Sequence, residues 1–210
     1  MPQKKKIPSV ADKRQALRDT YVGYTQVPGL EEVCRGLSLV MGNGNYRPAA
    51  ILVGEAPGRR EDELGRPFVG MSGRRLDAAL TEHGIDRERL WVTNVVKARP
   101  DNNRTPDDEE ILASIPFLWR EISLLSFALP WTPPILALGR VAATALSDMA
   151  PMGVGAQRGS WLQRRSPVDG KWHPFLITYH PSALRSKTTT EQFYLDIGKL
   201  GAKIAELVRV

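Results

Sequence analysis

The chain is poor in cysteine and in long apolar runs. It has 210 residues but one cysteine, Cys34, so neither a disulfide nor a cysteine-based metal cluster can form within it. No segment approaches the roughly 20 consecutive apolar residues of a membrane span. The first residues, MPQKKKI, are basic and lead into no apolar core, unlike a signal peptide. We therefore expect a soluble cytoplasmic protein with no membrane partner.

Acidic residues are the minority among the charged side chains. Lys and Arg number 29 against 23 Asp and Glu, which gives a formal net charge of +6. This balance favours an anionic partner, with nucleic acid before a membrane surface; the alternative is ordinary surface charge that keeps a protein soluble. The sequence has no Walker-type phosphate loop and no cluster of metal-ligating residues, which argues against a nucleotide hydrolase.

The length fits one α/β domain with a full hydrophobic core. Residues 1–20 are mostly polar and include three consecutive lysines, Lys4 to Lys6. We predict that they form a basic, flexible arm and that residues 21–210 form a single domain. We also expect the protein to be a monomer.

The stretch from Ala49 to Leu80 is the most informative part of the chain. Its apolar run, Ala49 to Val53, stops at Gly54 and shows no alternation of polar and apolar residues. That pattern is typical of a strand buried on both faces of a parallel sheet. A long polar loop is expected next, because a Pro-Gly pair follows at 57–58. Ser72 is expected to cap the helix after the loop.

Three acidic residues and one aromatic residue lie in this loop. Glu55, Glu61 and Asp62 carry carboxylates, and Phe68 stands in a second Gly/Pro segment, Gly65 to Gly70. In open α/β sheets such a loop lies at the carboxyl ends of the strands, where ligands bind. The alternative interpretation is a mobile surface loop, since loops are polar by default.

Apolar patterns predict three further strands and four further helices. The strands cover Leu90–Val96, Ile135–Leu138 and Phe175–Tyr179, the last within a hairpin of Ser160–Arg165 with Lys171–Tyr179. The helices cover Leu30–Met41, a segment that is capped by Thr105 or Asp107 and runs to about Phe127, then Val141–Met149 and Glu191–Val208. Pro116 should kink or break the second of these helices. Alternating strands and helices predict an α/β fold with a mostly parallel, four-stranded sheet.

Each predicted strand ends at residues suited to bind a ligand. These are Glu55 with Phe68, then Asn94, then Gly139-Arg140, and last His180-Pro181-Ser182. An amide suits the hydrogen-bonding edge of a base, and a Phe ring offers a stacking surface. Together they indicate a pocket for a nucleobase turned out of a nucleic-acid helix. Taken singly, His180 is better interpreted as a structural histidine, and Asn94 fits the cap of a strand end.

Arginines surround this predicted pocket, and their guanidinium groups suit phosphates. They are Arg59, Arg60, Arg66, Arg99, Arg104, Arg140 and Arg185. A glycine at the strand-to-helix turn, Gly139, leaves the N-terminus of the next helix open as an anion site.

In combination, these residues resemble the uracil-DNA glycosylase superfamily, and most closely its family 4. GEAPG at 54–58, the Glu61-Asp62 pair and GRPFVG at 65–70 are similar to the first motif of that family. VTNVVKARP at 92–100 is similar to the second motif, LG-x-x-A at 138–142 to the third, and HPSALR at 180–185 to the last. The resemblance extends roughly from residue 49 to residue 207, and it implies a three-layer α/β/α fold.

The resemblance implies a DNA-repair enzyme that hydrolyses the bond between uracil and deoxyribose and leaves an abasic site. It assigns His180 to the O2 atom of the leaving uracil, Asn94 to the base edge and Phe68 to the ring face. Gly54 and Ala56 are expected to complete the base pocket. The substrates implied are double-stranded and single-stranded DNA that contain uracil.

The resemblance leaves open which carboxylate orients the attacking water. Ala56 occupies the place where family 1 enzymes have an aspartate. Glu55, or Glu61 and Asp62 through the loop, must therefore orient the water or stabilise the cationic sugar.

The resemblance also implies contacts with the DNA around the flipped base. Leu184 is expected to fill the gap that the base leaves in the stack. The residues expected near phosphates are Arg99, Arg104, Arg140, Ser182 and Arg185.

Members of family 4 usually hold an iron–sulfur cluster on four cysteines. Here Cys34 is the single candidate for the first pair, while Ala98 and about Ala113 stand where the other two are expected. A cluster normally needs four such ligands, so we expect no metal or other cofactor, and apolar packing in the cluster's place. The rival function is a DNA-binding protein that keeps the glycosylase pocket but has lost turnover.

Overall fold

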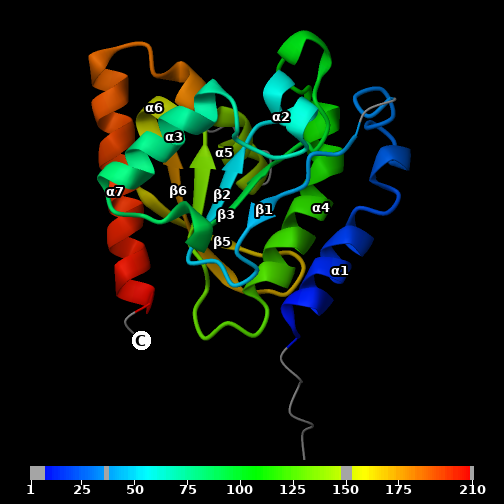
Figure 1. The fold of residues 1–210 in the computed structure, drawn as a ribbon, viewed down its shortest axis with the longest axis horizontal. Coiled ribbons are helices and arrows are strands. Elements are labelled where there is room, and N and C mark those ends of the chain that lie inside the picture. The colour runs from blue at the N-terminus through cyan, green and yellow to red at the C-terminus, as the bar shows by residue number, and fades with distance from the viewer. Residues whose placement is uncertain (1–7, 36–37, 148–152, 209–210) are drawn as a thin grey trace, which may run out of the picture.

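The computed structural model describes residues 8–35, 38–147 and 153–208. Its strands form one sheet in the order β1-β3-β2-β4-β6-β5 (Figure 1). The bounds are β1 Asn43–Gly44, β2 Ile51–Gly54, β3 Trp91–Asn94, β4 Ile135–Leu138, β5 Trp161–Arg165 and β6 Trp172–Thr178. The four inner strands are parallel to one another, and β1 and β5 pair antiparallel at the two edges. The mostly parallel sheet is confirmed, but it has six strands in the described residues rather than four.

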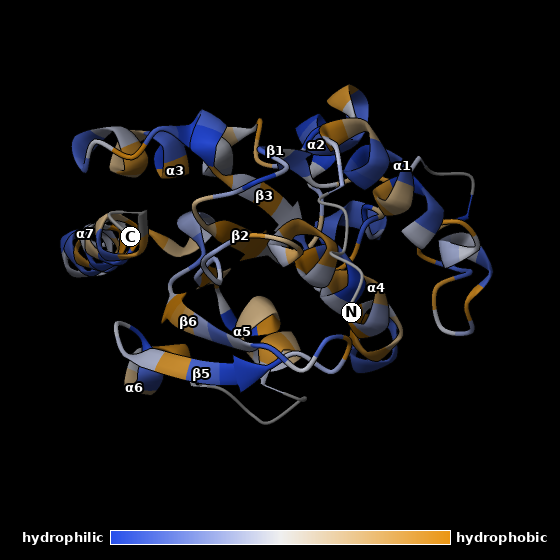
Figure 2. Ribbon diagram, turned by 90° about the horizontal axis from the view of Figure 1, so that it is seen from below, coloured by the Kyte–Doolittle hydropathy of each residue, from blue (hydrophilic) through white to orange (hydrophobic). Residues whose placement is uncertain are grey.

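Helices cover both faces of the sheet. Their bounds are α1 Val10–Thr20, α2 Arg59–Leu64, α3 Met71–Glu82, α4 Asp108–Ser126, α5 Arg140–Leu146, α6 Val154–Gln157 and α7 Lys187–Val208. α3 and α7 lie on one face, and α4 and α5 lie on the other (Figures 1 and 2). The predicted three-layer α/β/α architecture is therefore confirmed. None of the described helices is both long and apolar enough to span a membrane.

Successive residues of the inner strands enter opposite layers of the core. Ile51 and Val53 of β2 pack in one apolar cluster with side chains of α4 and α5. Leu52 packs in a second cluster with side chains of α3 and α7. Because both faces are buried, the strand is a continuous apolar run in the sequence. In Figure 2, β2 is accordingly largely orange, whereas the edge strand β5 carries blue stretches.

The prediction of a flexible arm over residues 1–20 is wrong for residues 10–20. These residues form α1, which has a capping box at its N-terminus and packs against α4. Lys13 is buried there, and its Nζ atom donates hydrogen bonds to the backbone oxygens of Tyr46 and Leu125. The aliphatic part of the Lys13 side chain thus packs where an apolar residue usually does. The apolar pattern that predicts a helix is therefore incomplete in this segment. Residues 1–7 lie outside the described part of the chain.

Three other predictions are corrected by the structure. The helix predicted at Leu30–Met41 is absent from its described part, where residues 30–35 form turns. Further on, the Val40 N–H donates to the backbone oxygen of Lys97 rather than to a helical partner. The polar loop after β2 contains α2. The next helix, α3, has Gly70 rather than Ser72 as its N-cap residue.

Other boundaries shift by a few residues. α4 continues through Pro116 without a break. α5 begins at Arg140 and ends at Leu146; the end predicted for it, Met149, lies outside the described residues.

Candidate active site

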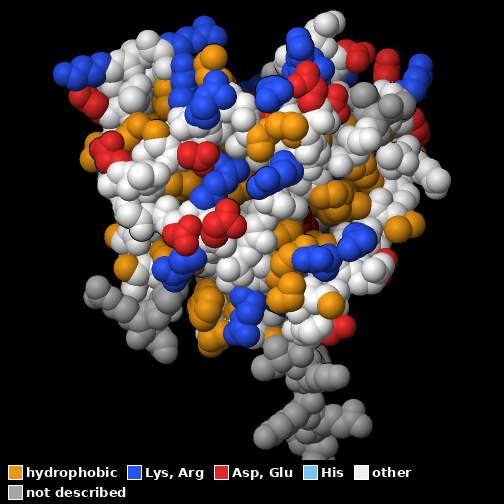
Figure 3. Space-filling model, in the orientation of Figure 1, with side chains coloured by type: hydrophobic (Ala, Val, Ile, Leu, Met, Phe, Trp, Pro, Cys, Tyr) orange, Lys and Arg blue, Asp and Glu red, His pale blue; other side chains and the backbone are white. Residues whose placement is uncertain are grey.

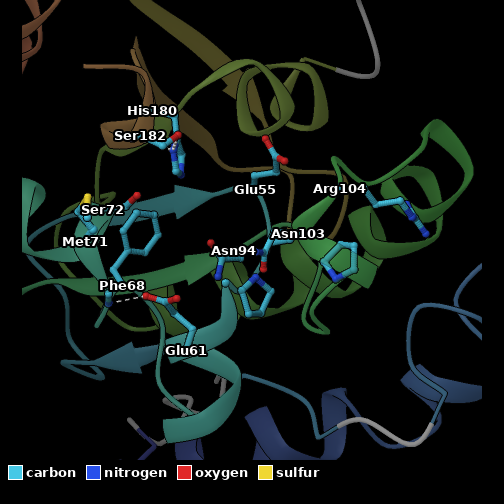
Figure 4. Close-up of a pocket in the computed structure, with 15 residues that line it drawn as sticks. Glu55, Glu61, Phe68, Met71, Ser72, Asn94, Asn103, Arg104, His180 and Ser182 are labelled. Atoms are coloured by element: carbon cyan, nitrogen blue, oxygen red, sulfur yellow. Dashed lines mark hydrogen bonds between the residues drawn. The ribbon is translucent and has the colours of Figure 1, made fainter. Parts of the chain in front are cut away.

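A pocket of about 380 Å³ opens where the parallel strands end (Figure 4). This volume lies near the lower end of the range for small-molecule sites. The lining residues are Glu55, Ala56, Pro57, Gly58, Glu61, Phe68, Gly70, Met71, Ser72, Asn94, Pro100, Asn103, Arg104, His180 and Ser182. They follow β2, β3 and β6 or begin α3, so three of the four strand ends expected to share one site do share it; Gly139 and Arg140, which follow β4, lie outside the described lining.

The predicted site residues divide into two groups. Those that line the pocket are Glu55, Ala56, Glu61, Phe68, Asn94, Arg104, His180 and Ser182. Those outside its described lining are Gly54, Asp62, Arg99, Arg140, Leu184 and Arg185.

Gly54 lies directly behind the pocket and allows the side chains of Asn94 and Phe68 to meet. A Cβ atom at Gly54 would lie 2.4 Å from Oδ1 of Asn94 and 2.5 Å from Cζ of Phe68. Distances this short are not tolerated between heavy atoms. Any larger residue at the end of β2 would push the amide and the ring apart.

Asn94 ends β3 with a buried side chain. Within the described part of the chain, no group donates a hydrogen bond to its Oδ1 atom. Leaving such an acceptor unpaired costs about 1–3 kcal/mol. A ligand that brings an N–H to this position would remove that penalty.

Phe68 forms one wall of the pocket with a strained backbone. Its φ angle is +54°, which is unusual for a bulky residue and costs of the order of 1–3 kcal/mol. The carbonyl oxygen of Phe68 accepts a hydrogen bond from Nη2 of Arg87. A Cβ atom at Gly73 would lie 1.9 Å from that oxygen, so the turn depends on a glycine at that position.

Glu61 holds the loop that carries Phe68. Its Oε1 atom accepts hydrogen bonds from the backbone N–H groups of Val69, at 2.8 Å, and Gly70, at 2.7 Å. The other carboxylate oxygen of Glu61, Oε2, faces Gly58. A Cβ atom added at Gly58 would lie 2.8 Å from it. Glu61 thus stabilises the wall of the pocket.

His180 follows β6 and points into the pocket toward Phe68 (Figure 4). The two ring centroids are 5.9 Å apart. The Nδ1 atom of His180 accepts the backbone N–H of Ser182 at 3.2 Å, so in the neutral ring the proton lies on Nε2. Burial lowers the pKa of His180 to about 4, and the charge of Glu61 opposes that shift. Near neutral pH the ring is therefore an uncharged N–H donor.

Glu55 lies at the opposite side of the pocket mouth from Phe68 (Figure 4). Burial raises the pKa of its carboxyl group, while a hydrogen bond from Thr105 and the charge of Arg140 lower it. A half-buried carboxylate with a raised pKa is a better proton acceptor than one in water.

The arginines near the pocket are not equally available to a ligand. The guanidinium of Arg104 is bound to both carboxylate oxygens of Glu110, at 2.8 and 2.5 Å. Nε of Arg99 donates to Oδ1 of Asn103 at 2.8 Å. Arg140 and Arg185 are exposed. Lys and Arg side chains gather on either side of the hollow along the upper edge of the molecule in Figure 3.

The motifs that build this pocket match a known family. Residues 41–197 match the sequence profile of the uracil DNA glycosylase superfamily. The chain belongs to this superfamily.

Relatives within the superfamily include three type-4 uracil-DNA glycosylases. The protein of Pyrobaculum aerophilum is 41% identical over 164 residues, which cover 75% of this chain and 79% of the relative. The protein of Thermotoga maritima is 38% identical over 155 residues, or 73% and 75% of the two chains. The protein of Archaeoglobus fulgidus is 34% identical over 170 residues, or 77% and 80%. The predicted similarity to the type-4 branch is confirmed.

The iron–sulfur cluster usual in that branch does not fit the residues of this chain. Cys34 is buried, and burial raises the pKa of its thiol to about 11. Ala98 belongs to the same apolar cluster as Cys34, and Ala113 packs against that cluster. Beside Ala113, the Ser114 hydroxyl is hydrogen-bonded to that of Tyr24 at 2.7 Å. One thiol, two methyl groups and a pair of hydroxyls do not supply four thiolate ligands.

In the motif at residues 180–185, the position of Leu184 does not match the gap-filling role expected for it. Leu184 is 9% exposed and packs in the cluster formed with α3 and α7. Its side chain therefore does not project into solvent in this conformation. Met71, at the first residue of α3, lines the pocket and is 63% exposed.

Some pocket residues of this glycosylase fold were not predicted from the sequence. Met71, Ser72, Pro100 and Asn103 line the pocket, although the motifs contain or adjoin each of them. Arg75 lies behind them, and its Nη1 atom donates to the backbone oxygen of Pro181 at 2.9 Å. A hydrogen bond between residues 106 positions apart leaves no local signal in the sequence.

Proposed function

We propose that the protein is a monofunctional uracil-DNA glycosylase, which turns uracil out of DNA and hydrolyses its bond to deoxyribose. The observation that carries this proposal is the unpaired Oδ1 atom of Asn94, buried in a pocket beside Phe68 and His180. The similarity to type-4 uracil-DNA glycosylases supports the same reaction class.

Base selection would depend on the amide of Asn94. Uracil carries an N–H at N3, which would donate to the unpaired Oδ1 atom, and the amide NH₂ would donate to O4. Cytosine has an acceptor at N3 and an amino group at C4, so each of its groups would face a group of its own kind. Phe68 would stack on the ring of the selected base.

Departure of the base would depend on His180. When the bond between C1′ and N1 breaks, its electron pair stays with uracil and negative charge develops on O2. The Nε2–H of a neutral His180 would donate to that oxygen, and the interaction would be stronger in the transition state than in the ground state. A charged imidazolium is not needed, in line with the pKa of about 4.

Among the three candidate carboxylates, Glu55 has the best-supported role in orienting water. Glu61 already binds two backbone N–H groups through Oε1, and Asp62 is outside the described lining of the pocket. Glu55 would orient water toward C1′, stabilise the positive charge on the sugar and take the proton that the water loses.

DNA that contains uracil, single-stranded or double-stranded, is the proposed substrate. Arg140 and Arg185 are exposed and suited to phosphates. Arg104 is not proposed to bind a phosphate, because its guanidinium is already held by Glu110. Leu184 is buried, so its side chain would have to leave the core before it could fill the gap left by the flipped base.

A cleavage assay tests the proposal directly. An end-labelled oligonucleotide with one uracil is incubated with the protein and then heated in alkali, which cuts the strand at an abasic site. We expect a break at uracil and none in matched oligonucleotides with thymine or cytosine at that position. Binding of the uracil strand without any break would instead support the rival function, a DNA-binding protein without turnover.

A further inference from the structure

Two charged side chains lie in the core behind the pocket, and the proposed reaction uses neither. The side chains of Lys97 and Glu121 are 0% and 1% exposed, and Nζ lies 2.8 Å from Oε2. Lys97 follows β3 in the second motif, whereas Glu121 belongs to α4. Removing two charges from water costs on the order of several kcal/mol per ion. A gain in folding stability is therefore a weak explanation for such a pair. Its contacts suggest another purpose.

Lys97 folds back onto the strand that carries Asn94. The Nζ atom of Lys97 donates to the backbone oxygen of Asn94 at 2.6 Å and to Oγ1 of Thr93 at 2.5 Å. The third donor goes to Glu121 at 2.8 Å. All three protons of the ammonium are thus used. Bonds from a charged donor are roughly twice as strong as neutral ones, so the last residue of β3 is held firmly.

Glu121 is held in turn by three further donors. Nε1 of Trp91 donates to Oε1 at 2.8 Å, while the hydroxyls of Tyr21 and Thr93 donate to Oε2 at 2.7 and 3.1 Å. Gly42 closes the cage, since a Cβ atom there would lie 2.2 Å from Oε1. Tyr21 is the C-cap residue of α1, so the network links the N-terminal helix to the strand end.

We propose that the Lys97–Glu121 network is a positioning device for base recognition, which holds Asn94 at the location where its amide can read uracil. The inference rests on the proposed function of the pocket. Asn94 needs such support because its own Oδ1 atom has no partner among the described residues. Toward β2, this strand end is held by backbone bonds such as that from the Val95 N–H to the oxygen of Gly54. Lys97 and Glu121 are positioning residues, since neither lines the pocket.

The chain contains a matched control for Lys97. Lys13 is also buried, and its Nζ atom donates to two backbone oxygens, those of Tyr46 and Leu125, each at 3.0 Å. It holds α1 against α4 but makes no contact with β3 in the interactions described for it. Replacement of either lysine by methionine keeps most of the volume and removes the charge.

The test compares Lys97→Met with Lys13→Met in single-turnover excision of uracil from a single-stranded oligonucleotide. Circular dichroism melts select a temperature at which both variants and the parent are folded. Because small displacements of a positioning group can cost up to ~10²-fold, we expect Lys97→Met to be at least about 10-fold slower than the parent. Lys13→Met should stay within about twofold of the parent, since the hydrogen bonds of Lys13 go to Tyr46 and Leu125 and not to β3, Glu121 or Tyr21. Equal rates for the two variants would overturn the proposal.

Methionine at position 97 leaves Glu121 as an unpaired buried charge, which can prevent folding. In that case the double variant Lys97→Met/Glu121→Gln takes its place, because it removes both charges together. The expectation and the comparison with Lys13→Met stay the same. A double variant as fast as the Lys13→Met protein would count against a positioning role.

A second readout does not depend on excision. In protein labelled with ¹⁵N-asparagine, the side-chain NH₂ signals of Asn94 are assigned from their loss in Asn94→Asp. We expect Lys97→Met, but not Lys13→Met, to shift or broaden these signals. Unchanged signals would refute the proposal even if excision slows. If the parent does not excise uracil, the proposed function fails, and this measurement alone then decides whether Lys97 positions Asn94.

Discussion

Removal of the imidazole of His180 should slow uracil excision far more than it weakens DNA binding. Only one of the two ring nitrogens is available to the base, because Nδ1 already accepts the N–H of Ser182. The change His180→Ala therefore deletes one oriented donor, the Nε2–H group. Loss of one such donor to a developing oxyanion typically costs ~10²–10³ in rate, or roughly 3–4 kcal/mol. We expect single-turnover excision to fall by that factor.

The same change should have little effect on folding. Ser182 is exposed, so water can replace the lost contacts to its N–H and hydroxyl groups. Affinity for duplex DNA without uracil, measured by fluorescence anisotropy, should stay within about twofold, because the proposed contact of His180 is with the base rather than with the phosphates.

A control histidine lies at the far end of α3. His83 is exposed and follows the last residue of that helix, whereas the first residue, Met71, lines the pocket. His83→Ala should leave excision unchanged. If His180→Ala folds normally and excises uracil within threefold of the parent, roughly 0.6 kcal/mol, His180 is not part of the mechanism. Glu55 would then have to supply most of the catalytic effect.

Three further changes follow from the geometry of the pocket. Gly54→Ala should slow excision roughly 10- to 100-fold, because a Cβ atom 2.4 Å from Oδ1 of Asn94 forces a displacement that costs about 1–3 kcal/mol. Excision should decline as the pH falls through the raised pKa of Glu55, since only the ionised carboxylate accepts a proton, and Glu55→Gln should abolish that decline. Arg140→Ala should lower the slope of log K against log salt by about 1, while Arg104→Ala should leave the slope unchanged because Glu110 already neutralises it.

Each of these predictions has its own control and its own contrary result. Gly155→Ala adds a methyl group where no atom lies within 4 Å, and an equal effect there would remove the steric explanation for Gly54. If excision by Glu55→Gln still declines as the pH falls, the decline is due to the protonation of another group. An equal drop in salt slope for both arginine variants would show that Arg104 leaves Glu110 to bind DNA.

The sequence by itself determined the sheet and the edge at which the site forms. Strands buried on both faces are usually apolar, so β2 and β4 were visible as uninterrupted runs. β3 was visible as a β-branched segment although it ends in Thr93 and Asn94. Parallel strands share one carboxyl edge, so residues that follow different strands can meet there. Asn94, Phe68 and His180 were therefore brought to one pocket by reasoning that needed no coordinates.

The sequence could not separate residues that contact the ligand from residues that support them. Glu55 and Glu61 are equivalent as carboxylates in one loop, and only the fold shows that Glu61 is occupied by two backbone N–H groups. Arg104 and Arg140 are equally basic, but the first is held by Glu110. These differences arise from the distance and direction of hydrogen bonds, which residue type does not specify.

Burial of polar residues was likewise decided by the tertiary structure alone. α1 was hidden because a lysine occupies one of its core positions, and Lys97 with Glu121 would ordinarily be assigned to the surface. Leu184 shows the opposite case, a residue expected to reach DNA that packs in the core instead. Local sequence determines which segments can be strands or helices. Which charged groups can be buried depends on partners from distant segments, such as Lys97 and Glu121, 24 positions apart.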